Sequence, residues 1–98
     1  MAKIIAIDFD GTYSADPELF DVFIAKAKNH GHSVFCVTFR DAEKHGRVDI
    51  PGVEVFYTSG ILKAEYMASV DLIPDIWIDD MPHLIGQAPT LLGLALNG

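Results

Sequence analysis

The sequence predicts a three-layer α/β fold, a Rossmannoid domain with a mainly parallel central sheet of about four to six strands. Apolar runs that are typical of buried strands occur at residues 4–7, 33–37 and 76–78. An amphipathic segment separates the first two runs, and this strand–helix–strand order implies a right-handed crossover between parallel strands. Acidic or hydroxyl side chains follow each run, at the edge where ligands bind in such sheets.

Length and composition favour one folded domain over residues 1–98. Half of the residues are apolar, which is enough for a hydrophobic core. The formal net charge of −7 argues against binding nucleic acid or an anionic membrane through a broad basic face. We expect a cytoplasmic protein without membrane contact, because the sequence shows neither a secretory signal nor an apolar run of membrane-spanning length.

The first half of the chain predicts a strand, a long helix and a second strand. After the strand at residues 4–7, Asp16 and Pro17 are a strong helix start, with an acid at the N-cap and proline at the first helical position. Gly31 is placed to end this helix. The second strand follows at residues 33–37, and its apolar surroundings predict that Cys36 is a buried structural thiol.

The second half predicts two further strands and a second helix. Residues 41–50 are polar and are expected to form one or two helical turns before a turn at Pro51 and Gly52. A third strand at residues 53–57, a helix at 61–70 and a fourth strand at 76–78 follow. The apolar segment at residues 90–96 is assigned to a last strand, while a short helix or an oligomer contact stays open for it.

Two pairs of acidic residues come directly after predicted strands. Asp8 and Asp10 follow the first strand, and in extended backbone they would point the same way. Two like charges so close raise each other's pKa unless a cation lies between them, and a hard divalent ion such as Mg²⁺ would meet that need. Asp79 and Asp80 follow the fourth strand. A plain acidic turn is the alternative interpretation of either pair.

Thr38 and Lys63 are single residues that the predicted topology brings toward the same edge. Thr38 follows the second strand, and Lys63 lies near the start of the second helix, where a cation opposes the helix dipole. A strand-end threonine and a solvated helix lysine are the structural alternatives. The four histidines show no metal-ligand spacing, although His83, like Arg40, could contact a ligand at the rim of the site.

The order of these features resembles the haloacid-dehalogenase-like (HAD) superfamily of Mg²⁺-dependent phosphohydrolases. The matching stretches lie between residues 4 and 80 and consist of Asp8-Phe9-Asp10-Gly11-Thr12, residues 34–38 ending in Thr38, Lys63, and residues 76–80 ending in Asp79-Asp80. The cap domains of this family are inserted after the first motif or after the third strand, and neither place has room for one here. The resemblance therefore implies a minimal member without a cap domain.

The resemblance also implies a phosphomonoester hydrolase that works through an aspartyl-phosphate. Asp8 would be the nucleophile, and Asp10 would protonate the leaving oxygen and then activate water. Thr38 and Lys63 would bind the phosphate, together with the backbone amides of Phe9 and Asp10. A site without a cap would admit a large phosphorylated substrate, such as a protein or a polynucleotide end, or would be covered by a neighbouring subunit.

The resemblance implies a Mg²⁺ site made of acidic residues. Asp8 and Asp79 would be ligands, the backbone carbonyl of Asp10 would contribute another oxygen, and Asp80 would be a ligand or would support one. Two other functions stay open: a phosphotransferase, and a non-catalytic or regulatory protein that binds phosphate and Mg²⁺. A receiver-like phospho-acceptor is disfavoured, because that class needs an acid after the third strand and this chain has Thr58-Ser59 there.

Overall fold

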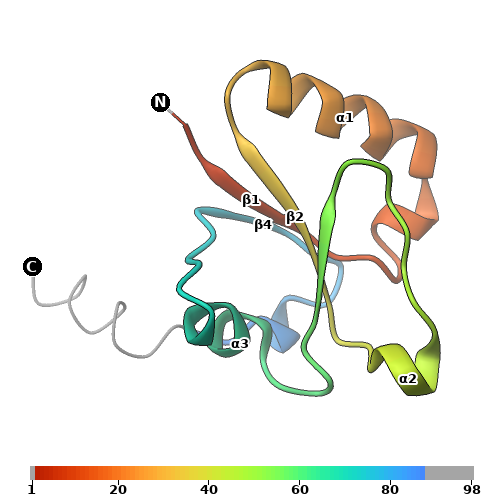
Figure 1. The fold of residues 1–98 in the computed structure, drawn as a ribbon, viewed down its shortest axis with the longest axis vertical. Coiled ribbons are helices and arrows are strands. Elements are labelled where there is room, and N and C mark those ends of the chain that lie inside the picture. Colours follow the sequence, from red (N-terminus) through yellow and green to blue (C-terminus); the bar gives the residue numbers. More distant parts are fainter. Residues whose placement is uncertain (1, 88–98) are drawn as a thin grey trace, which may run out of the picture.

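Four parallel strands form the sheet of the computed structural model, which describes residues 2–87 (Figure 1). The strand order is β3-β2-β1-β4, and all three neighbouring pairs are parallel. The strands are β1 (Ile4–Ile7), β2 (Ser33–Thr38), β3 (Glu54–Tyr57) and β4 (Ile76–Ile78). The predicted parallel α/β fold is confirmed, and the segment at residues 90–96 lies outside the described residues.

Helices pack on both faces of this sheet and complete the three layers. Figure 1 shows α1 (Pro17–Asn29) on one side and α3 (Lys63–Ser69) on the other. The short helix α2 (Ala42–His45) follows β2, in the segment where one or two helical turns are predicted. Among residues 2–87, no helix combines the length and the apolar character needed to cross a lipid bilayer.

The start of α1 follows the prediction, whereas α3 is shorter than predicted. Asp16 caps α1, since its side chain accepts a hydrogen bond of 3.2 Å from the backbone N–H of Leu19. The prediction of a helix over residues 61–70 is wrong at both ends. Ile61 belongs to a turn in which its N–H bonds to the Thr58 carbonyl, and Leu62 has extended backbone (ψ 134°), so α3 begins only at Lys63.

Side chains that alternate along the strands build one hydrophobic cluster on each face of the sheet. Ile5 and Ile7 of β1 belong to the larger cluster, which lies under α1. Ala6, between them, belongs to a smaller cluster with Met67 of α3. Because successive strand side chains point to opposite faces, the next even-numbered residue, Asp8, is directed to the face that α3 covers.

The reactivity of Cys36 reports how well this core excludes solvent. Its side chain is fully buried in β2, as predicted, and burial raises the pKa of its thiol to about 12. Reagents attack the thiolate, so we expect the native protein to react with a disulfide reagent far more slowly than free cysteine does at mildly alkaline pH. Reaction of one thiol per chain should appear when guanidinium chloride unfolds the protein. Rapid reaction of the native protein would contradict this packing.

Candidate functional site

The carboxyl ends of β1 and β4 bring the two acidic pairs together. The two strands are neighbours in the sheet, and Ile7 pairs with Ile78. The residues that follow this pair, Asp8 and Asp79, therefore leave the sheet side by side, and the Asp8 N–H donates to the Ile78 carbonyl at 2.9 Å. Parallel pairing in this register thus places acids that are 71 residues apart in the sequence at one edge of the sheet, as the sequence predicts.

A buried ammonium group joins Asp8 to Asp79. Lys63 Nζ donates to Asp8 Oδ1 at 2.8 Å and to Asp79 Oδ2 at 2.6 Å. The Lys63 side chain is only 1% exposed, and the Asp8 side chain is 7% exposed. Lys63 is the first residue of α3, where its charge opposes the helix dipole. The two carboxylates compensate for this, so the position of Lys63 at the helix start is explained by its contacts with the acidic residues.

Thr12 connects the other oxygen of Asp8 to Asp80. Its hydroxyl donates to Asp8 Oδ2 at 3.1 Å, lies 3.3 Å from Asp80 Oδ1, and accepts from the Asp80 N–H at 3.2 Å. Gly11 precedes it with a φ of +79°, and a Cβ atom at this position would overlap the Asp80 carboxylate. Sequence reasoning placed Thr12 in the first motif without giving it a contact. A side chain from one loop that bonds both acidic pairs could be located only in three dimensions.

The three acids beside Lys63 form a group that could hold a metal ion. Asp8, Asp79 and Asp80 each offer a carboxylate oxygen, and these oxygens lie within 4.8 Å of one another. One ammonium group cannot neutralise three carboxylates, so the cluster favours a further cation. Carboxylate oxygens are the ligands that hard ions such as Mg²⁺ and Ca²⁺ prefer, whereas structural zinc sites use nitrogen and sulfur. The donor set therefore fits a hard divalent cation, the class to which the predicted Mg²⁺ belongs.

The environment of Asp8 disfavours its charge when only protein groups surround it. Burial raises the pKa of its carboxyl group to about 6, and the charge of Asp79 acts in the same direction. The ammonium of Lys63 acts in the opposite direction without reversing the shift. A divalent cation bound by the cluster would favour the ionised form further, because metal ions are the largest charges in such sites.

The Asp10 carboxylate lies apart from this cluster and is paired with Arg40. Arg40 Nε donates to Asp10 Oδ2 at 2.8 Å, and Arg40 Nη2 donates to Asp10 Oδ1 at 2.9 Å. The guanidinium group holds the pKa of Asp10 below its usual range. The group of acids that could share an ion does not include the Asp10 side chain. The predicted metal contact of Asp10 uses its backbone carbonyl, so the pairing with Arg40 does not conflict with it.

Thr38 and Phe9 line the side of the site that faces Arg40. Thr38 is 1% exposed, and its hydroxyl accepts a hydrogen bond of 3.3 Å from the Arg40 N–H. The Phe9 ring lies under the guanidinium group, 5.1 Å from ring centroid to Arg40 Cζ. Sequence reasoning gave Arg40 only a role at the rim. Its spacing two residues after Thr38 carried no physical signal of a contact with Asp10.

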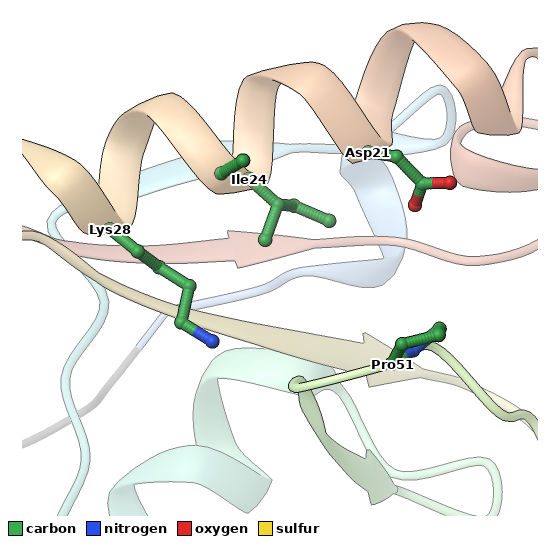
Figure 2. Close-up of a pocket in the computed structure, with 5 residues that line it drawn as sticks. Asp21, Ile24, Lys28 and Pro51 are labelled. Carbon is green, nitrogen blue, oxygen red and sulfur yellow. The ribbon is translucent and has the colours of Figure 1, made fainter.

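One pocket of the described residues adjoins this part of the site. An open pocket of about 450 Å³ is lined by Asp10 and Arg40 together with Phe39 and His45. Figure 2 shows another, of about 390 Å³, between α1 and the segment before β3. Its charged groups already have protein partners, since Asp21 accepts from the Tyr13 hydroxyl and Lys28 donates to the Gly52 carbonyl. The pocket beside Asp10 is the candidate for ligand binding because a predicted site residue lines it.

Comparisons with protein-family models, with curated proteins and with solved structures found no match for this chain. The fold and the geometry of the sheet edge are thus the basis for a function. They define a Rossmann-like α/β domain with an acidic cluster at the carboxyl ends of its central strands.

Proposed function

We propose that this chain is a Mg²⁺-dependent phosphomonoester hydrolase of the HAD type, with Asp8 as its nucleophile. The observation that supports this most strongly is the contact between Asp8 and Lys63 at a sheet edge shared with two further acids. A nucleophilic carboxylate must approach an anionic phosphate, and a nearby ammonium group reduces the repulsion. An acidic turn with no chemical role would not require a buried lysine between its carboxylates.

The residues of the site account for both halves of the reaction. An Asp8 oxygen attacks phosphorus and forms the aspartyl-phosphate while the bond to the leaving oxygen breaks. Asp10, which Arg40 holds as a carboxylate, first takes up a proton from solvent and gives it to that oxygen. It then accepts a proton from the water that attacks the intermediate and releases inorganic phosphate. The Thr38 hydroxyl donates to a phosphate oxygen, as do the amides of Phe9 and Asp10. Bound Mg²⁺, held by Asp8, Asp79 and Asp80, would neutralise phosphate charge.

The open site favours hydrolysis over transfer to a second substrate. The described residues form no cap domain, and the pocket beside Asp10 is open to solvent. Water therefore has access to the intermediate, and a phosphotransferase would need a means to exclude it. Asp10 favours an enzyme over a binding protein, since its carboxylate lies outside the acidic cluster and is not needed to hold an ion. A large phosphorylated molecule fits an open site as substrate.

Metal dependence tests this proposal. We expect the wild-type protein to release phosphate from an aryl phosphate in the presence of Mg²⁺, to lose this activity in excess EDTA, and to regain it when Mg²⁺ is restored. The measurement is inorganic phosphate released over time. If no phosphate appears, trifluoroberyllate can be tested as a mimic of the phosphorylated aspartate. Binding of this mimic without turnover would indicate a phosphate-binding protein, and equal activity with Mg²⁺ or EDTA would contradict the metal site.

A further inference from the structure

We propose that Arg40 is a positioning residue, which holds the Asp10 carboxylate in the orientation that acid–base chemistry needs. The inference rests on the proposed function and extends it to a residue outside the acidic cluster. The Asp10 side chain is 57% exposed, and within residues 2–87 both hydrogen bonds that its carboxylate accepts come from Arg40. An exposed aspartate otherwise moves between rotamers, whereas two parallel hydrogen bonds fix both of its oxygens.

Arg40 has two contacts besides Asp10, and these fix the position of its guanidinium group. Its Nη1 donates to the His45 carbonyl at 3.0 Å, and its guanidinium group lies over the Phe9 ring. His45 ends α2, and Asp41 caps the start of this helix by accepting from two backbone N–H groups. The short helix α2 therefore carries the contact that holds Arg40, and through Arg40 it determines where Asp10 lies.

These contacts distinguish Arg40 from a residue that binds the substrate phosphate. Three N–H groups of the guanidinium already have protein acceptors, and two of them are committed to Asp10. Its positive charge is therefore largely compensated by the Asp10 carboxylate. Loss of Arg40 should disturb the step that Asp10 catalyses more than it disturbs substrate binding. The expected signature is a fall in kcat with little change in KM.

A double-mutant cycle tests this role. Arg40→Met should lower kcat by about 10–100-fold, because small displacements of a catalytic group have effects of this size, and KM should change by less than about twofold. Arg40→Lys should restore little, since an ammonium group cannot make the paired contact. In an Asp10→Asn background, Arg40→Met should have no further effect. An aryl phosphate with an acidic leaving group keeps the Asp10→Asn rate measurable, because it needs less help from an acid.

Arg47→Met is the matched control, because its guanidinium lies over the Tyr57 ring and has no contact with Asp10 among the described residues. It should leave kcat unchanged. A raised KM in Arg40→Met, with equal losses in both backgrounds, would show that Arg40 binds substrate and would overturn the proposal. Wild-type kinetics in Arg40→Met would overturn it as well. Melting curves of Arg40→Met and Arg40→Lys separate a loss of folding from a loss of positioning.

A measurement without turnover separates failure of this proposal from failure of the proposed function. Nitrogen-15 NMR of the arginine Nε–H groups should give a slowly exchanging Arg40 signal that shifts and broadens in Asp10→Asn. An Arg40 signal that is insensitive to Asp10→Asn would overturn the positioning contact, whatever the activity. If the signal responds but the wild-type protein hydrolyses no phosphate ester, the proposed function fails, and the catalytic role of Arg40 fails with it.

Discussion

Asp8→Asn is expected to lower phosphate release by a factor on the order of 10⁴ or more, as removal of a nucleophile does in other enzymes. The amide has nearly the same shape as the carboxylate but cannot form the aspartyl-phosphate. The fold should survive, because Lys63 keeps its second partner, Asp79. The measurement is phosphate release with Mg²⁺ at saturating substrate, accompanied by a melting curve that confirms folding.

Asp49→Asn provides the matched control for this loss. Asp49 is exposed and belongs to neither acidic pair, so the same chemical change there should leave the rate of phosphate release unchanged. Activity of folded Asp8→Asn close to that of the wild-type protein would show that another residue attacks phosphorus. The aspartyl-phosphate mechanism would then be wrong, even if the metal dependence were confirmed.

Lys63→Met is expected to lower the free energy of unfolding of the metal-free protein strongly. Removal of the ammonium leaves the Asp8 and Asp79 carboxylates buried and facing each other without a counter-charge. Breaking a buried ion pair by removing one partner costs about 3–5 kcal/mol, a large part of the roughly 5–15 kcal/mol that stabilises a typical domain. Denaturant unfolding in EDTA, followed by circular dichroism, measures this loss.

Mg²⁺ should restore part of that stability, because an ion bound only by the folded state shifts the unfolding equilibrium toward it. Even if Lys63→Met is unfolded in EDTA, Mg²⁺ should therefore induce its circular dichroism signal. Lys26→Met serves as the control, since Lys26 is exposed on α1, and its stability should depend on Mg²⁺ as that of the wild-type protein does. Equal stability of Lys63→Met and wild-type protein in EDTA would mean that the lysine does not compensate the acidic cluster.

The sequence by itself determined the parts of this protein that follow from local physical chemistry. Residue patterns in the sequence predicted the apolar strands, the capped start of α1 and the acids that follow β1 and β4. Parallel strands share one carboxyl edge, so the order of elements placed Asp8 and Asp79 at the same edge of the sheet. That β1 and β4 are neighbours, which brings these acids side by side, was decided by the tertiary structure. The buried position of Cys36 followed from the apolar run that contains it.

Only the tertiary structure decided which side chains meet at that edge. The start of α3 at Lys63 is one case. The helix dipole disfavours a positive charge there, but two carboxylates from other segments pair with the Lys63 ammonium group. The pairing of Asp10 with Arg40 is another, since it depends on how α2 is held after β2. Thr12 bonds to residues from two loops. Such contacts depend on the relative placement of loops, which hydrophobic periodicity does not encode.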